Sequence, residues 1–352
     1  MTRIHGIFIS AIVTLAAIAM VGILDFNLRQ MRPLAEAPPI FDGYFALRSL
    51  FAFLLSAFFA ILIYRNRDEA IVLPLSPRVY RIGFNISCFA ACIMIAAIEL
   101  LVFNPPLFRL LAVEDSIFEW ASALLLFMGS GFLAVSALRT TFAAGRRSMT
   151  GGLAMFLGLI MFVIGMEEVS WLQRVFDWRT PGWLREINAQ RETNLHNIII
   201  SEAENSYYAG AFLLMVVYPF VSYGSSVWKR AESIKFLVPS RHVLLIGAFS
   251  TTFSYEMWNI FWMQAAFYFG LAALFISCLE LRRNGSQTDL VLFLAAFFIL
   301  LAAQTINLSF GSNLIRAWED TELKELIIAA GLFLYALEIG LKMSKIRRHV
   351  RA

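Results

Sequence analysis

Two adjacent glutamates, Glu167 and Glu168, end a long apolar run, and this position predicts chemistry at the edge of a membrane. Neighbouring residues on a helix point about 100° apart, so one carboxyl group can face other helices while its neighbour faces lipid headgroups. An ionisable side chain at this depth is costly and is by default a candidate functional residue. We therefore expect Glu167 or Glu168 to act as a general base or a metal ligand. The alternative is a structural ion pair with Arg174 or Arg109.

His196 is the second candidate, because it lies among amide and carboxyl side chains at the end of the same stretch. One histidine with two or three carboxylates suits a divalent metal ion, whereas a His–Glu pair suits general acid–base catalysis without a metal. No HExxH or HxxxH spacing is present, so the metal prediction depends on proximity alone. A hydrogen-bonded structural histidine is the alternative. The predicted catalytic residues are Glu167, Glu168 and His196.

The polar residues around these candidates are predicted to bind a substrate. Arginine binds anionic groups through two parallel hydrogen bonds, so Arg174 or Arg191 would hold an anionic headgroup. By the i, i+4, i+7 spacing of a helix, Trp171 and Arg174 share a face with Glu167. The predicted substrate-binding residues are Arg174, Trp171, Gln173, Arg191, Asn194 and Asn197.

Acids at other apolar boundaries extend the predicted site. Glu114 and Asp115 precede an apolar run, where acids favour the positive end of a helix dipole, but Glu119 lies inside the run. Glu99, late in the preceding run, has no base nearby in sequence and is expected to join the glutamate pair in a carboxylate cluster. A divalent metal ion is an open possibility, with Glu168, His196, Glu119 and Glu99 as its predicted ligands.

The composition indicates which elements position these residues. Of 352 residues, 59% are apolar and 15% charged, against about 25% charged in globular proteins. Apolar runs of this length form helices in lipid, because every backbone polar group must be satisfied within the segment. The prediction is an all-α polytopic transmembrane bundle forming one integral membrane domain, 1–352. Its ten expected helices are 8–25, 45–64, 83–103, 117–138, 150–168, 208–226, 242–257, 260–281, 289–308 and 323–343.

The connectors between these helices predict the topology. Arginine and lysine cluster after the second, fourth, sixth and eighth helices and at the end of the chain, which places both termini in the cytoplasm. The net charge of +4 therefore indicates no nucleic-acid partner. The longest connector, 169–207, then lies outside, with a short interfacial helix after Thr180-Pro181-Gly182. The seventh helix is ambiguous, since 254–259 leaves almost no connector before the eighth. The alternatives are that the seventh and eighth are a pair of short helices or a re-entrant hairpin.

The central stretch also resembles a family of uncharacterised bacterial multipass membrane proteins. Their pattern reads E-E-x-S-W-G-Q-R, then T-P, then N-x-Q-x-E-x-N-L-H-N. The matching residues run from Glu167 to Arg174 and from Asn188 to Asn197, with Leu172 where glycine is common. The resemblance covers about 50 residues, includes Glu114 to Glu119, and implies the bacterial inner membrane and the site but no activity. The start of the fourth helix is loosely similar to alkaline-ceramidase-like hydrolases, whose multi-histidine zinc site has no counterpart here.

Three functions remain open from the sequence. The first is an integral membrane enzyme with an outward-facing acidic/His site that acts on a lipid or lipid-linked substrate. The second is a transporter or flippase-like protein, which would need polar groups deep in several spans. The third is a non-catalytic subunit or scaffold of a membrane complex, with the 166–197 stretch docking a periplasmic protein partner.

Overall fold

The computed structural model describes residues 3–66, 76–113, 116–144, 149–222, 236–313 and 320–351, and these are helical with short connections. Eight of the described helices are long and apolar enough to cross a membrane, which supports a multipass integral membrane protein in contact with a lipid bilayer. The all-α prediction is confirmed; ten spans and cytoplasmic termini stay predictions. The eight helices are α1 (Arg3–Arg29), α2 (Gly43–Arg65), α3 (Pro77–Phe103), α5 (Ile117–Ala144), α6 (Met149–Glu168), α13 (Phe261–Asn284), α14 (Gln287–Phe310) and α15 (Asp320–Arg351).

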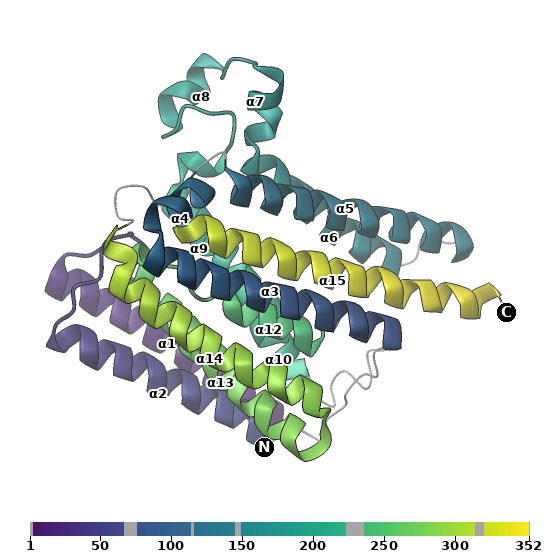
Figure 1. Ribbon diagram of the computed structural model, residues 1–352, viewed down its shortest axis with the longest axis horizontal. Helices are drawn as coiled ribbons and strands as arrows, with labels where there is room; N and C mark the ends of the chain where they lie inside the picture. The colour runs from purple at the N-terminus through teal and green to yellow at the C-terminus, as the bar shows by residue number, and fades with distance from the viewer. Residues whose placement is uncertain are drawn as a thin grey trace.

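The helices form a bundle around α13 and α15 (Figure 1). In these two, 67% and 72% of the apolar stretch is buried, against 11% in α1, so α1 lies at the edge. Helix α15 packs along α5, and α5 along α6. At Gly340 of α15 a side chain would collide with Phe132 of α5, so the missing side chain is what lets the two helices approach.

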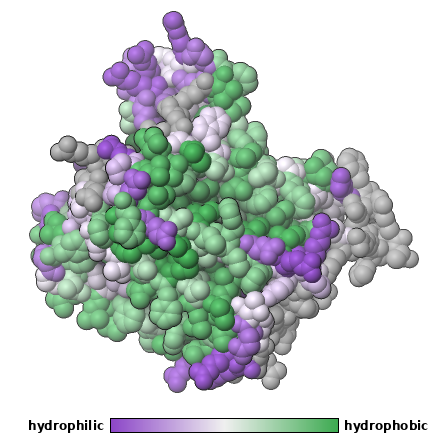
Figure 2. Space-filling model, viewed as in Figure 1, coloured by the Kyte–Doolittle hydropathy of each residue, from purple (hydrophilic) through white to green (hydrophobic). Residues whose placement is uncertain are grey.

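The outer surface of the bundle is mostly hydrophobic (Figure 2). Large apolar side chains such as Phe156, Leu159 and Phe162 of α6 are exposed along the helices. An apolar face of this extent is unsuited to water and matches the hydrocarbon of a bilayer. Hydrophilic side chains gather instead at the helix ends and on the segment that holds α7 (Gln173–Phe176) and α8 (Gly182–Ile187). This segment projects from the bundle beside the start of α5 and the end of α6 (Figure 1).

Two further segments cross the bundle in a less regular way. Helices α9 (Ile200–Phe212) and α10 (Tyr218–Ser222) are joined by the π-helical turn Leu213–Val217 into one continuous rod. The predicted helix 208–226 therefore begins earlier, and its last four residues lie outside the described part. Helix α12 (Arg241–Phe249) is only nine residues long and is followed by an irregular stretch and the 3-10 turn Glu256–Asn259. The predicted helix 242–257 is thus wrong beyond Phe249.

Local hydrogen bonds explain why α12 ends. The hydroxyls of Ser250, Thr251 and Thr252 each donate to the carbonyl three residues earlier, at 2.7–2.8 Å, and compete with helical hydrogen bonding. Phe253 then adopts a positive φ of 53°, which turns the chain. Every residue from 242 to 261 is buried, so this irregular backbone is enclosed by protein rather than exposed to lipid. We call residues 241–259 the broken crossing.

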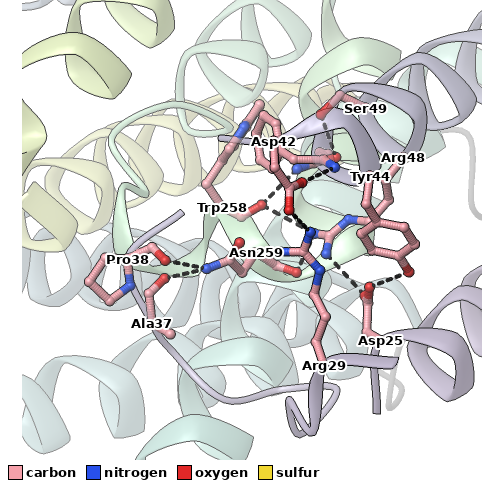
Figure 3. Close-up of polar contacts among 12 residues, drawn as sticks. Asp25, Arg29, Ala37, Pro38, Asp42, Tyr44, Arg48, Ser49, Trp258 and Asn259 are labelled. Carbon is pink, nitrogen blue, oxygen red and sulfur yellow. Dashed lines mark hydrogen bonds and ion pairs between the residues drawn. The ribbon is translucent and has the colours of Figure 1, made fainter. Parts of the chain in front are cut away.

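A buried ion pair fixes the far end of the broken crossing (Figure 3). Arg48 of α2 donates from Nη1 to Asp25 of α1 at 3.0 Å and from Nη2 to the carbonyl of Asn259. The Asn259 amide donates to the carbonyls of Ala37 and Pro38, each at 2.7 Å. These bonds satisfy backbone groups that no helix satisfies, and they join the α1–α2 connector to the broken crossing.

Two shorter helices complete the end of the bundle that holds the candidate site. Helix α4 (Pro105–Ala112) follows α3, and Asn104 caps it by accepting from the Leu107 amide at 3.2 Å. The 3-10 turn His196–Ile198 leads into α9. Helix α8 occupies the position of the predicted short helix after Pro181; its location at a membrane surface stays a prediction.

Candidate functional site

A cavity of about 880 Å³ opens where α6 ends and where α5, α9 and α15 begin. Eight of its lining residues are glutamates, from the α1–α2 connector, α5, α6, the 188–197 segment, α9 and α15. They are Glu36, Glu119, Glu167, Glu168, Glu192, Glu204, Glu322 and Glu325. The remaining lining is partly polar, through amides, hydroxyls and His196, and partly apolar. We call this space the acidic cavity.

Helix starts supply several of these carboxyl groups. Glu119 lies in the first turn of α5 and Glu322 in the first turn of α15, where an acid interacts favourably with the helix dipole. Glu325 follows Glu322 by three residues and so lies on the same face. Glu168 is the last residue of α6. Helix-start chemistry therefore explains why acids occur here but not why four helices direct them into one space.

Glu168 and Glu325 form the innermost carboxyl pair. Their side chains share a hydrogen bond, and the charges of Glu322 and Glu119 act on Glu168. The Tyr208 hydroxyl donates to Glu325 at 2.6 Å. A hydrogen bond between two carboxyl groups requires that one of them holds a proton, so this pair can both accept and donate one. This is the arrangement that general acid–base catalysis requires.

Glu36 and Glu204 form a second carboxyl pair in the lining of the acidic cavity. The two side chains share a hydrogen bond, and burial is the main cause that raises the pKa of Glu36, in the α1–α2 connector, above its ordinary value. Glu36 therefore holds a proton at a higher pH than free glutamate does.

Lys324 provides a buried cation directly behind the cavity. Its side chain is 2% exposed, and its ammonium donates to Ser254 Oγ at 2.7 Å. The same ammonium lies 4.0 Å from the centre of the Tyr208 ring, a cation–π contact. The charges of Asp320, Glu325, Glu204 and Glu36 act on it, in decreasing order. Lys324 thus connects the acidic cavity with the irregular part of the broken crossing.

Glu167 faces a different set of partners from Glu168. It accepts from Trp171 Nε1 at 2.7 Å and from the backbone amides of Leu195 and His196 at 2.7 and 3.0 Å. His196 Nδ1 lies 3.4 Å from the same carboxylate. The two backbone contacts join the end of α6 to residues 195–196, and the other two hold the Trp171 and His196 side chains beside Glu167. Glu167 and His196 therefore form the rim of the acidic cavity.

The other polar residues of the predicted site mainly bind one another. Gln173 accepts from the Thr193 amide at 2.7 Å and donates to Thr180 at 2.8 Å, and Thr180 donates to the carbonyl of Arg191 at 2.7 Å. These bonds join the first part of the projecting segment, at Gln173 and Thr180, to its last part, at residues 191–193. Gln173, predicted to bind substrate, is engaged within the segment and does not line the cavity.

Asn194 is the centre of a second network in the same segment. Its side chain donates to Ser170 at 3.0 Å and to Glu192 at 3.2 Å, and it accepts from Asn188 at 2.9 Å. Asn188 and Asn194 are buried, and Ser170 also bonds to Glu192. Asn194 therefore reaches the cavity lining as part of a rigid network.

The predicted site residues divide into two groups in the structure. Glu119, Glu167, Glu168, Asn194, His196 and Asn197 line the acidic cavity. Trp171, Gln173 and Arg191 do not, and Arg191 is exposed; the side chain of Arg174 lies outside what the structure describes. Glu99 is exposed on α3 and is not among the described residues that line the cavity; the buried face of that helix carries Ala97 and Leu101.

A metal ion has no preformed site in the described part of the chain, where no three His, Cys, Asp or Glu side chains are arranged to hold one. Metal ligation by Glu168, His196 and Glu119 stays a prediction. The sequence analysis missed Glu36, Glu325 and Lys324 as residues at this cavity, whereas Glu204 is one of the carboxyl side chains near His196 in sequence. A lysine between two glutamates inside an apolar run was the signal available for Lys324.

Comparisons with protein-family models, with curated proteins and with solved structures find no match for this chain. The likeness of the 167–197 stretch to uncharacterised bacterial membrane proteins stays a resemblance. The argument for function therefore starts from the acidic cavity.

Proposed function

We propose that this protein is an integral membrane enzyme that acts on a lipid or lipid-linked substrate in the acidic cavity. The supporting observation is the hydrogen-bonded pair of Glu168 and Glu325, since two carboxyl groups that share one proton can exchange it with a substrate. Glu325, which accepts a hydrogen bond from Tyr208, serves as general base, and Glu168, which donates the shared proton, serves as general acid. His196 on the rim is the second group able to transfer a proton.

The apolar wall of the cavity supports a lipid substrate. Val163 and Ile164 of α6 line the cavity, and Val163 is 40% exposed on the hydrophobic outer surface of the same helix. Val163 therefore connects the cavity with the outer face of α6, which is exposed to lipid chains if this helix spans the membrane. This arrangement lets an acyl or prenyl chain remain in the bilayer while its polar end reaches the carboxyl pair.

The test is a comparison of lipid products. Purified protein is reconstituted with a whole lipid extract, and products are followed by mass spectrometry for the wild type, Glu168→Gln and Glu325→Gln. We expect each substitution to lower product formation by a factor on the order of 10²–10⁴. Glu186→Gln, on the exposed surface of α8, is the matched control. Unchanged turnover in folded Glu168→Gln and Glu325→Gln would refute the proposed roles.

A transporter is the second candidate, and the broken crossing favours it. Interrupted helices near the middle of a bundle form the ion and substrate sites of many transporters, and Lys324 contacts the interruption at Ser254. Single cysteines placed in the acidic cavity and near Ser240 distinguish the two functions. Transport is supported if a substrate changes which of the two cysteines a thiol reagent in water can label. It is excluded if the cavity cysteine alone is labelled in every condition.

A further inference from the structure

The projecting segment exposes large apolar side chains, although hydrophilic residues cover much of it. Apolar side chains with exposed fractions between 44% and 64% are Val175, Phe176, Trp178, Trp183 and Ile187. Val175 and Phe176 belong to α7, and Trp183 and Ile187 belong to α8. So many exposed apolar side chains in so short a stretch are unfavourable in water and indicate a surface that contacts something apolar.

The exposed apolar residues are arranged in two groups. In α8, Trp183 and Ile187 are four residues apart and share one face of the helix, whereas Arg185 points to the opposite face. Beside α7, the rings of Phe176 and Trp178 stack on each other with their centres 5.5 Å apart. The segment is therefore amphipathic, with aromatic rings in both groups and a charged side chain directed away from the apolar face of α8.

The direction of the projection places this segment beside the bundle. In Figure 1 it extends sideways from the end of α6 and the start of α5, across the direction of these helices rather than onward along them. Both helices are long and apolar enough to cross a membrane. A segment that leaves their ends sideways lies over the neighbouring lipid instead of extending into water. The side of the segment on which α7 lies is hydrophobic, whereas hydrophilic side chains cover its tip (Figure 2).

The segment also begins next to a surface that is suited to lipid. Phe162 and Val163 of α6 are exposed, as expected for the outer face of a membrane-spanning helix. A turn then ends the course of α6, because Ser170, Trp171 and Leu172 have φ values of 46°, 54° and 62°. Three successive residues in the left-handed region cannot continue a right-handed helix, so the chain leaves the axis of α6 before α7 begins. The apolar surface thus continues from α6 to α7 around this turn.

We propose that the projecting segment rests on the bilayer beside α6 and inserts its exposed apolar side chains into the lipid headgroup layer. Tryptophan is favoured at this depth, because its ring is apolar while its N–H can bond to water or to a headgroup. The occupant of this surface is lipid and not a protein partner. The sequence predicted an interfacial location only for the helix after Pro181; the proposal adds α7 and the Phe176–Trp178 stack. It applies to an enzyme and to a transporter alike.

Contact with lipid also supports the rim of the acidic cavity. Gln173, at the start of α7, accepts from the Thr193 amide at 2.7 Å. Asn194 and His196, which follow Thr193, line the cavity. Lipid under the segment therefore holds one side of this connection, while the hydrogen bonds of Glu167 hold the other.

The experiment measures where single positions of the segment lie relative to the bilayer. Full-length Phe176→Cys, Ile187→Cys and Arg185→Cys are labelled with the fluorophore NBD and reconstituted in vesicles of phosphatidylcholine and phosphatidylglycerol. Iodide in the water and lipids with a nitroxide near the headgroup quench the fluorophore from opposite sides. Arg185→Cys is the matched control, since it lies on the opposite face of α8. Wild-type protein treated in the same way corrects for labelling of the three native cysteines.

All three substitutions replace exposed side chains, so we expect unchanged thermal unfolding. Iodide quenching should be several-fold weaker at 176 and 187 than at 185, and the nitroxide lipid should quench at 176 and 187 but only weakly at 185. Equal iodide quenching at all three positions would overturn the proposal, because the surface would then face water. Protection from iodide without quenching by the nitroxide lipid would also overturn it, since protein would then cover the surface. Lipid contact at 187 alone would reject the part assigned to α7. None of these readouts depends on turnover, so their failure leaves the proposed function standing.

Discussion

Glu167 and Glu168 are adjacent in sequence, yet their carboxyl groups have different surroundings. Glu167 accepts from an indole and two backbone amides, which commits it to holding the projecting segment against α6. Glu168 points to other acids and shares a hydrogen bond with Glu325. The sequence predicted that the two would face different ways but left open which residue had the structural role.

Replacing Glu167 by glutamine should loosen the projecting segment. The side chain keeps its size but loses its charge, and its amide N–H₂ then opposes either the Trp171 indole N–H or the two backbone N–H groups of Leu195 and His196, which share one carboxylate oxygen. Losing charge-assisted hydrogen bonds of this kind costs about 1.5–3 kcal/mol. Limited proteolysis should cut residues 170–197 faster in Glu167→Gln than in Glu168→Gln; equal rates would contradict the assignment.

Arg48 should be among the most sensitive positions in the described part of the chain. Arg48→Met would leave Asp25 buried without its cation and the Asn259 carbonyl without a donor, which costs about 3–5 kcal/mol. Thermal unfolding in detergent measures the loss. Arg185→Met on exposed α8 is the control and should unfold as the wild type does. Equal unfolding of both variants would show that the buried pair is unimportant.

At the scale of elements, the broken crossing and α15 depend on each other through Lys324. Lys324→Met removes the buried cation from Ser254 and from four acids, and we expect a loss of about 3–5 kcal/mol. Adding Glu204→Gln should restore part of the loss, because one acid no longer needs the cation. A double-mutant cycle by thermal unfolding gives the coupling; strictly additive effects would show that Lys324 and Glu204 do not interact.

Helices with uniformly apolar sequences were predictable. A helix that ends because side-chain hydroxyls compete for its backbone carbonyls was not. The spans α2, α5, α6 and α14 follow from apolar runs alone. Helix α12 was overextended, because the hydropathy of 242–257 does not reveal that Ser250, Thr251 and Thr252 bond back to the helix.

Part of the predicted site lines the acidic cavity. Glu168 and His196 stand out in sequence as polar residues at apolar boundaries, and both line this cavity. Glu322 and Glu325 lie near the start of α15, where the helix dipole alone accounts for acids, so their shared direction could not be predicted. Glu36 and Glu204 are 168 positions apart by their residue numbers, and only the packing of the bundle brings them together. Periodicity likewise does not show which face of α3 is buried, and Glu99 lies on its exposed face.

At the scale of the whole molecule, the glutamates of the acidic cavity and several arginines lie at opposite helix ends. The acidic cavity lies where α6 ends and α15 begins, whereas Arg65 ends α2 and Arg282 and Arg283 lie in the last turn of α13. If the basic end is cytoplasmic, the cavity opens outward.

Reporter fusions test this orientation. A fluorescent protein at the C-terminus should be active, and alkaline phosphatase at the same position should be inactive. Alkaline phosphatase inserted after Arg185, in the projecting segment, should be active if the predicted periplasmic location is right. The reverse pattern would place the cavity on the cytoplasmic side.

The hydrogen bonds of Glu167 also bear on the order in which the protein is made. Glu167 is synthesised before residues 195–196. Its carboxylate can therefore accept their backbone N–H groups as soon as those residues leave the ribosome. The acidic cavity has no such advantage: Glu36 is made near the beginning, and Glu322, Lys324 and Glu325 belong to the last described helix. Until α15 inserts, Glu168 lacks its partner Glu325 and Glu204 lacks the nearby cation Lys324, so a chain halted before that step would carry uncompensated acids at the membrane boundary.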